Sequence, residues 1–148
     1  MKKLEIKKEH YIAEGLARAC YNHPDNDDLC VKIGHPNIEF YRLYKEIKYF
    51  NKIKRRDTSK FDYLFYSDFH EEVETNLGRG FVFDLIRDEE SKKISLTLEN
   101  YLEMESMPFS KSILIKALKR LKQQMIKHKV FAKAVSYTHL TLPTTPYV

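Results

Sequence analysis

Long apolar runs and cysteine are both scarce in this chain of 148 residues. No stretch approaches the ~20 consecutive apolar residues that a membrane-spanning helix needs. The amino terminus, MKKLEIKKEHYIAEG, is charged and lacks the apolar segment of a secretory signal. We therefore expect a cytoplasmic protein with no membrane partner.

The two cysteines, Cys20 and Cys30, fit a reducing compartment as buried thiols. If residues 22–28 form a hairpin turn, the two thiols face each other across it. A zinc site is not expected, because a zinc site needs CxxC-type or His-rich spacing and His23 and His35 do not supply it. The sequence predicts no metal-ligating residues.

Glycine is also rare: the chain holds four glycines and has no internal repeat, so it offers few flexible joints. Against these absences stand a hydrophobic fraction of 43% and an aromatic fraction of 13%. That composition is sufficient for a packed core and argues against wholesale disorder. The length suits one domain or part of a larger protein.

The formal net charge of +5 is unevenly distributed. Residues 108–134 hold eight Lys or Arg and no acidic residue, whereas residues 1–107 hold eighteen basic and twenty-one acidic residues. The positive charge therefore belongs to one segment. We interpret it as a solvated helix face, and nucleic acid is not an expected partner. A polyanion-binding surface is the alternative interpretation.

β-branched, aromatic and apolar residues between turn signals predict five strands. The strands are expected at residues 10–15, 18–22, 29–33, 63–75 and 79–86. The segment HPDNDD predicts the turn before the third strand, and TNLG predicts a hairpin turn between the last two.

Three helices are predicted from the spacing of apolar residues. The first covers about residues 37–54, with a core stripe at Phe40, Leu43, Ile47 and Phe50. Its tyrosines, Tyr41, Tyr44 and Tyr49, could stack on bases, but we interpret them as core packing. A short helix starts near SLTLENYLEM, with Ser95 or Thr97 as its cap. The third covers residues 109–129, with a stripe at Leu114, Leu118, Leu121 and Met125.

The last fourteen residues, VSYTHLTLPTTPYV, differ in composition from the rest of the chain. They contain no charged residue, although 32% of the whole chain is charged. An ordinary uncharged tail is one interpretation. We favour another, in which the peptide is the translation of a sequencing-library adapter and residues after about Ala134 are not natural.

A lysine in an apolar strand requires an explanation, and Lys32 lies in the strand-type run DLCVKIG. In protein-kinase-like folds a strand lysine contacts nucleotide phosphates and pairs with a glutamate of the following helix. The following helix here offers Glu39 and Glu46, of which Glu46 is mid-helix. Spacing alone is a weak signal, and the candidate nucleotide loop keeps Gly15 but has Ala17 where a second glycine would stand.

Four longer strings carry a resemblance to a known family: ARACYNHPDNDDLCVKI, YKEIKYF, EEVETNLGRGFVFDLIRD and ISLTLENYL. In this order and spacing they resemble the PhoP regulatory network protein YrbL family of bacterial proteins, over roughly residues 10–131. The CY-x-HP hairpin, the VETNLGRGFVFD strand pair and the SLTL helix start are its most specific features.

The family belongs to the protein-kinase-like fold, and the resemblance therefore implies an α+β fold. Its amino-terminal lobe would be an antiparallel five-stranded sheet plus one helix, followed by the first helices of the carboxy-terminal lobe. We expect residues 1–88 to form the lobe with its hinge and 89–134 the helices of an incomplete second lobe. Residues 135–148 would be the non-native tail.

The resemblance also implies a nucleotide site that would hold ATP and Mg²⁺ in the intact protein. Gly15 would lie in the nucleotide loop, and Lys32 would bind phosphate with Glu46 as its ion-pair partner. Three residues would lie near the hinge that holds adenine: Ile86, Arg87 and Asp88. The implied partners are a nucleotide and an unidentified phosphate acceptor or protein.

The chain departs from a complete kinase-like protein after the third helix. Catalysis needs a catalytic loop with a metal-binding asparagine and a later aspartate. The sequence leaves the family pattern at VFAKAV, and no Asp, Glu or Asn follows. We therefore expect a truncated, inactive fragment of a kinase-like regulatory protein whose intact parent binds ATP–Mg²⁺ and transfers phosphate to a small molecule or protein. The alternatives are a non-catalytic interaction module, which the missing loop glycine favours, and a polyanion-binding protein that uses the basic helix.

Overall fold

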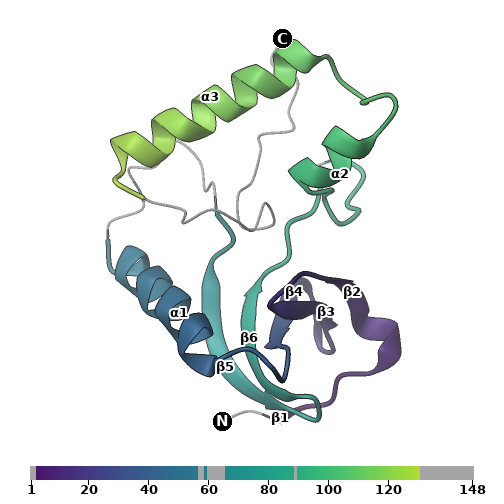
Figure 1. The fold of residues 1–148 in the computed structure, drawn as a ribbon, viewed down its shortest axis with the longest axis vertical. Helices are drawn as coiled ribbons and strands as arrows, with labels where there is room; N and C mark the ends of the chain where they lie inside the picture. The colour runs from purple at the N-terminus through teal and green to yellow at the C-terminus, as the bar shows by residue number, and fades with distance from the viewer. Residues whose placement is uncertain (1–2, 57–58, 60–65, 89, 131–148) are drawn as a thin grey trace. The chain divides into compact units, whose positions relative to one another are not determined.

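The computed structural model describes residues 3–56, 59, 66–88 and 90–130. The chain divides into two compact units, shown as a ribbon in Figure 1. Unit 1 comprises Met1–Asp57 with Asp68–Leu85, and unit 2 comprises Thr58–Ser67 with Ile86–Val148. The described part of unit 1 holds a sheet and one long helix, and that of unit 2 holds one short and one long helix.

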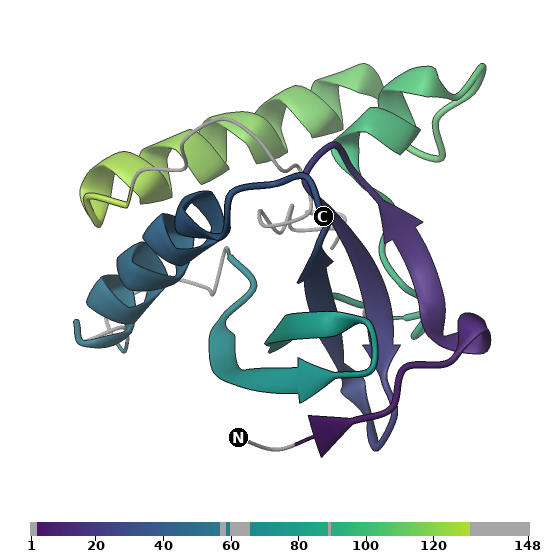
Figure 2. The same cartoon turned by 60° about the horizontal axis from the view of Figure 1, so that its bottom comes forward.

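Unit 1 is built on a six-stranded sheet whose spatial order is β1-β5-β6-β4-β3-β2 (Figure 2). The strands are β1 (Lys3–Leu4), β2 (Tyr11–Glu14), β3 (Arg18–His23), β4 (Asn26–Gly34), β5 (Phe69–Thr75) and β6 (Gly78–Asp84). Neighbouring strands are antiparallel except for β1, which pairs with β5 in parallel. A short 3₁₀ helix, η1 (Lys8–His10), connects β1 to β2.

Side-chain alternation gives this sheet two different faces. The outer face carries an aliphatic core that includes Val31, Val73 and Val82, and Leu4 and Ile6 pack into it. The other face, here called the inner face, carries the residues that alternate with these on the central strands. In the register of β4 and β6, Cys30 lies opposite Phe83 and Lys32 lies opposite Phe81.

Helix α1 (Phe40–Lys54) packs on the inner face (Figure 1). Its Phe50 ring lies 5.6 Å from the ring of Phe83, edge to face. Ile47, Phe50 and Ile53 are buried. Two of the four predicted stripe residues, Ile47 and Phe50, are thus confirmed as core, while the side chains of the other two lie outside the described residues. Ile53, which the predicted stripe omitted, is core as well.

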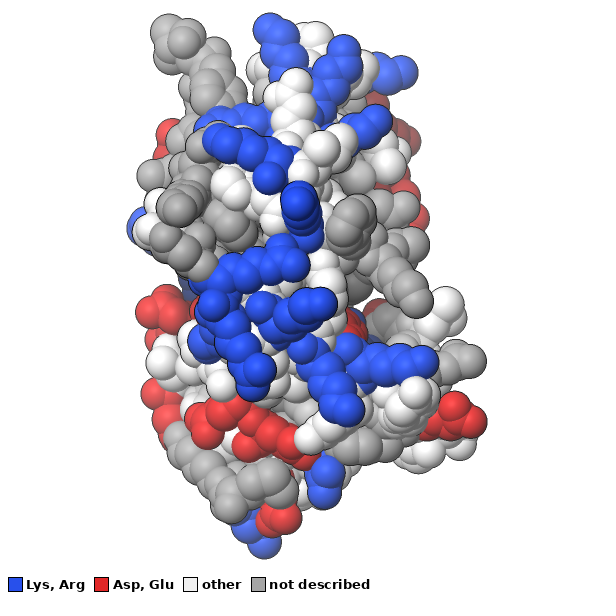
Figure 3. All heavy atoms as spheres, turned by 90° about the vertical axis from the view of Figure 1, so that its left-hand side faces the viewer, with Lys and Arg blue, Asp and Glu red and all other residues white. Residues whose placement is uncertain are grey.

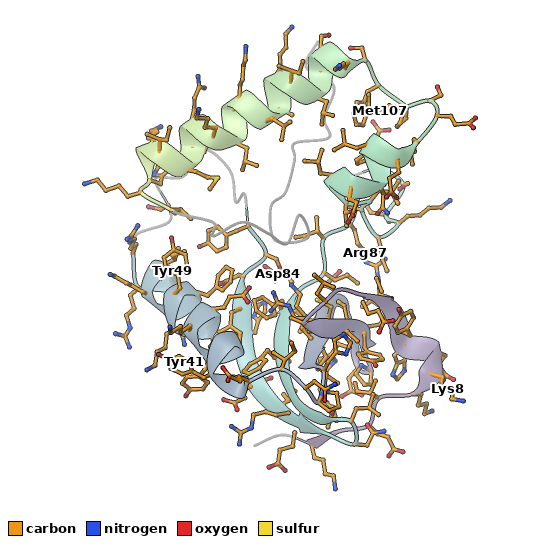
Figure 4. All side chains as sticks on the ribbon, in the orientation of Figure 1. Lys8, Tyr41, Tyr49, Asp84, Arg87 and Met107 are labelled. Carbon is orange, nitrogen blue, oxygen red and sulfur yellow. The ribbon has the colours of Figure 1, made fainter. Side chains whose placement is uncertain are left out.

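The tyrosines of α1 were predicted to pack in the core, and that prediction is wrong for two of them. Tyr41 is 64% exposed and Tyr44 is 40% exposed. Each ring is covered by a lysine one turn later, with Lys45 Nζ 4.5 Å from the Tyr41 centroid and Lys48 Nζ 5.7 Å from that of Tyr44. Figure 4 shows Tyr41 at the side of α1 that faces away from the sheet. These cation–π pairs account for exposed aromatic rings without core packing.

The predicted strands correspond to β2, β3, β4, β5 and β6, with different ends. The predicted strand at 63–75 is a strand from Phe69 onward, and its first part lies partly outside the described residues. The predicted five-stranded antiparallel sheet needs correction, because β1 adds a sixth, parallel strand. Two residues are too few to show alternation. The side chain of Asn76 holds this edge by bonding both the N–H and the C=O of Ile6, at 2.7 and 3.0 Å.

Unit 2 contains α2 (Leu98–Glu103) and α3 (Lys111–Lys127). Thr97 caps α2 by accepting the N–H of Asn100, as predicted, and Ser110 caps α3 by accepting the N–H of Ile113. In the predicted α3 stripe, Leu114 and Leu121 are buried, and the other two members are half-buried. Among the described helices, none combines the length and the apolar character that crossing a bilayer requires.

Gly80 permits the close packing of the outer face, and its substitution tests the strand register. A Cβ added at Gly80 would lie 2.7 Å from Cγ1 of buried Val31. We expect Gly80→Ala to lower the free energy of unfolding by about 1–3 kcal/mol in urea denaturation, because the core is overpacked. Gly15→Ala is the matched control, since a Cβ there meets nothing within 4 Å. Equal stability of the two variants would contradict the register.

Candidate functional site

Five polar or reactive residues meet on the inner face of unit 1. They are called the Lys32 cluster and comprise Arg18, Cys20, Cys30, Lys32 and Glu46. Four come from β3 and β4, where Cys20 lies opposite Lys32 in the antiparallel register. Because side chains two residues apart share a face, Arg18 and Cys30 join them, and α1 contributes Glu46.

Lys32 is the most buried charged residue of the cluster. The side chain is 5% exposed, and its Nζ lies 4.3 Å from the centroid of the Phe83 ring. Burial lowers the pKa of Lys32, and the positive charge of Arg18 lowers it further. The cysteines and Glu46 act in the opposite direction. The net effect lowers the pKa of Lys32, which means that keeping its ammonium charged in the folded protein costs free energy.

Glu46 forms a two-pronged ion pair with Arg18. Arg18 Nη2 donates to Glu46 Oε1 at 3.0 Å, and Nη1 lies 3.0 Å from Oε2. Both side chains are partly buried, at 17% and 28% exposed. The resemblance implied Lys32 as the partner of Glu46, and the glutamate also raises the pKa of Lys32. Of the two glutamates considered, the mid-helix one is therefore the member of this cluster.

Arg18 was not singled out from the sequence, although a signal for it exists. Residues 18 and 20 are two apart on β3, so their side chains lie on the same face of the sheet. If Cys20 shares the face of Lys32, Arg18 shares it as well. That assignment requires the register between β3 and β4. A single sequence does not give this register, because the turn between the strands includes an irregularity at Asn22 and His23.

The two thiols of the cluster differ in acidity. A hydrogen bond from Cys30 is the main cause that lowers the pKa of Cys20 to about 7, with Lys32 and Arg18 acting in the same direction against burial. The pKa of Cys30 is raised, because Cys30 keeps the proton of that hydrogen bond and is itself buried. The Cys30 thiol also donates to the carbonyl oxygen of Asp84, with Sγ and O 3.7 Å apart, so its one proton is shared between two acceptors.

The loop between β2 and β3 contains Gly15, the predicted nucleotide-loop residue. The Gly15 N–H donates to the Arg18 carbonyl at 2.9 Å. His35, just after β4, braces the same loop twice: its backbone N–H donates to Ala17 at 3.0 Å and its Nε2 lies 2.9 Å from the Gly15 carbonyl. Leu16, at the tip, is 100% exposed. His35 had been weighed only as a zinc ligand, so this role was missed.

The predicted hinge residues Ile86, Arg87 and Asp88 lie in unit 2, where they pair with residues 93–95. The Ile86 carbonyl accepts from the Ser95 N–H at 3.0 Å, and the Asp88 N–H donates to Lys93 at 2.9 Å. Asp88 also accepts from the Ser95 hydroxyl at 2.7 Å. These residues form a small ordered hairpin, and their role in binding a base stays a prediction.

Asp84, at the end of β6, connects two polar partners on or next to β5. Its Oδ1 lies 2.6 Å from His70 Nε2, and its Oδ2 accepts the Asp68 N–H at 3.0 Å (Figure 4). Asp68 in turn pairs with Lys54 at 3.4 Å. This chain of polar contacts fastens β5 and β6 to the end of α1. Across the described residues, no group of His, Cys, Asp and Glu has the arrangement of a metal site.

The ion pair between Arg18 and Glu46 is expected to stabilise unit 1 measurably. We expect a double-mutant cycle with Arg18→Met and Glu46→Gln to give a coupling energy of about 1–2 kcal/mol, because the pair is two-pronged and partly buried. Chemical denaturation of the four proteins measures it. The exposed pair of Lys7 and Glu9, 3.9 Å apart, is the control and should show no coupling. Zero coupling for both pairs would refute the structural role.

Comparisons with known proteins give one family. The family described as "PhoP regulatory network protein YrbL" matches residues 4–144, a span that takes in most of the uncharged tail. Two curated relatives carry the name "Uncharacterized protein YrbL", one from Escherichia coli (strain K12) and one from Shigella flexneri. Each is 27% identical over 129 residues, which is 86% of this chain and 60% of the relative. The chain thus spans about 60% of the length of these relatives.

Proposed function

The chain belongs to the PhoP regulatory network protein YrbL family, and we propose that unit 1 binds the phosphate groups of ATP through Lys32. In this proposal unit 1 is the amino-terminal lobe of a protein-kinase-like protein in the cytoplasm. The observation that carries the proposal is a lysine 5% exposed on the inner face, behind a braced hairpin loop.

The burial of Lys32 supports a binding role, because an apolar residue at this position would serve folding at least as well as a lysine does. Burial lowers its pKa, which means that the folded chain disfavours the charge. Ionisable groups with strongly perturbed pKa values concentrate at functional sites. A bound phosphate would repay that cost, because it supplies negative charge directly to the ammonium.

The chain order of unit 1 also supports the proposal. A hairpin of β2 and β3 precedes the lysine strand β4, and α1 with its glutamate follows, before β5 and β6. Protein kinases use this order: a loop over the phosphates, a lysine on the third strand and a glutamate on the next helix. Here β4 is the third strand when the two-residue β1 is set aside.

The charges of the Lys32 cluster favour an anion. Arg18 and Lys32 contribute two positive charges, and Glu46 contributes one negative charge. In a partly buried site this imbalance attracts phosphate more strongly than it would in water. Arg18 is an addition to the kinase pattern, and we propose that it holds Glu46 until a phosphate binds.

The activity of the whole protein is a further proposal, since this chain covers 60% of its relatives. We propose that the parent binds ATP with Mg²⁺ and transfers phosphate to an unidentified acceptor. Among the described residues no group of His, Cys, Asp and Glu has the arrangement of a metal site, and we derive no transfer step. A non-catalytic regulatory module is the alternative, and it would bind nucleotide without transfer.

Thermal unfolding of the chain with and without MgATP tests the binding. At ten times the dissociation constant, binding adds about 1.4 kcal/mol, which corresponds to an increase of about 3–5 °C in Tm for a chain of this size. We expect Lys32→Met to abolish that increase. Without nucleotide, Lys32→Met should unfold at the same or a higher temperature, because a buried charge is removed.

Lys45→Met is the matched control for this experiment. It removes the same charge from an exposed position on α1, and the MgATP response should stay at its original size. An increase in Tm that survives in Lys32→Met would overturn the role of Lys32. Transfer of labelled phosphate by the longer parent, and not by this chain, would separate a kinase from a non-catalytic module.

A second candidate function is polyanion binding by α3. Its exposed face carries Lys111, Lys116, Lys119, Lys122 and Lys127, with no acidic residue. Figure 3 shows that basic side chains also cover α1. Exposed lysines on α1 include Lys45 and Lys48. The residue counts predicted that the positive charge belongs to one helix. Exposed lysines on α1 show that it is not restricted to that helix.

Heparin chromatography separates the two candidates. We expect two double variants, one with Lys119 and Lys122 changed to alanine and one with Lys45 and Lys48 changed, to elute at similarly lowered salt, since each loses two exposed charges. A decrease confined to the α3 variant would favour a dedicated polyanion site on that helix.

A further inference from the structure

Cys20 and Cys30 occupy neighbouring strands on the inner face, and nothing in the nucleotide proposal uses them. Cys20 lies opposite Lys32 in the β3–β4 register, and Cys30 precedes Lys32 by two residues on the same face. Both cysteines are free thiols. Cys20 is half-buried, whereas Cys30 is buried. Two thiols therefore share one side of the sheet with a buried ammonium and a guanidinium.

We propose that Cys20 is a modification site that reacts with hydroperoxides, because it lies opposite Lys32 on the face that Arg18 and Cys30 share, and is more exposed than Cys30. The inference goes beyond the proposed function and does not depend on nucleotide binding. It depends on a constellation of four residues from two strands, and not on one cysteine.

The thiol acidities agree with this geometry. The pKa of Cys20 is lowered to about 7, first by the hydrogen bond from Cys30 and then by Lys32 and Arg18. A larger share of Cys20 is therefore thiolate at neutral pH than for a free cysteine, of which only a few per cent is ionised. Cys30 retains its proton, because its own pKa is raised by the same hydrogen bond and by burial.

The reaction is a two-electron oxidation of sulfur by a hydroperoxide, with hydrogen peroxide as the simplest case. The Cys20 thiolate attacks one peroxide oxygen, an S–O bond forms, and the O–O bond breaks. Sulfur is oxidised to a sulfenic acid, Cys20–S–OH, and the departing oxygen is reduced to hydroxide, which takes a proton from the buffer and leaves as water. Thiolate character and access together determine which cysteine reacts. Both favour Cys20 over its buried neighbour.

The surroundings of Cys20 determine how its reactivity depends on pH. The titratable and charged groups that face it are Cys30, Lys32 and Arg18, with Glu46 beyond Arg18 and Asp84 near Cys30. The oxidised sulfur carries an added oxygen between the two cations. If unit 1 also binds phosphate there, oxidation would compete with the nucleotide for the same positive charge.

Sulfenic-acid trapping tests the proposal on the full chain without nucleotide. The protein is treated with a slight excess of hydrogen peroxide and a 1,3-cyclohexanedione probe, and labelled peptides are quantified by mass spectrometry. We expect label on Cys20 and none above background on Cys30. At pH 6.5 Cys20 should react about fivefold faster in the folded chain than in the urea-unfolded chain. This ratio combines the larger thiolate fraction of an acidic thiol with its lower intrinsic nucleophilicity.

Two variants test the activating contacts. Cys30→Ala removes the hydrogen-bond donor and Lys32→Met removes one cation, and each should slow Cys20 labelling about three- to fivefold at pH 7. Lys45→Met, on the exposed side of α1, should leave the rate unchanged. Preferential labelling of Cys30, or a native rate for Cys20 no faster than that of the unfolded chain, would overturn the inference. The unfolded reference needs no variant, so the test holds even where a variant fails to fold.

Discussion

The burial of one ammonium group, that of Lys32, determines the organisation of the inner face of unit 1. The group lies over the Phe83 ring at 4.3 Å, on a sheet face that also carries Phe81 and the two cysteines. Burial disfavours its charge, and Arg18 disfavours it further, so compensation must come from negative or polarisable neighbours. Glu46 and the acidic thiol of Cys20 supply it. Each of these residues comes from a strand or helix whose packing the aromatic core fixes.

The positive charge of Arg18 lowers the pKa of both Lys32 and Cys20, and the lysine and the thiol also shift each other's pKa. A thiolate at Cys20 raises the pKa of Lys32, and the ammonium in turn lowers the pKa of Cys20. Cys30 assists by donating a hydrogen bond and staying protonated. The arrangement resembles functional sites in general, where paired groups move each other's pKa values in opposite directions. An apolar core of the same volume would be simpler and more stable.

Much of this could be predicted from the sequence, because strands and helices leave periodic signals. The strand lysine and the mid-helix glutamate were found from their places in such patterns. Arg18 and His35 were missed, because their roles depend on which residues of neighbouring strands lie opposite each other. Register is a property of two strands together, and the irregularity after Asn22 hides it from a single sequence. The exposure of Tyr41 was missed for a related reason: a cation–π partner one turn away substitutes for a core.

The proposed nucleotide binding and the proposed thiol chemistry both require the positive charge of Lys32 and Arg18. Glu46 already compensates part of the charge of Arg18 in a two-pronged pair, and Lys32 carries the other positive charge of the cluster. A phosphate group and a thiolate would each be stabilised by it, and each would weaken the other by reducing the local positive potential. Nucleotide binding should therefore raise the pKa of Cys20 and protect it. In this way the state of a thiol would report on the occupancy of the phosphate site without any change in fold.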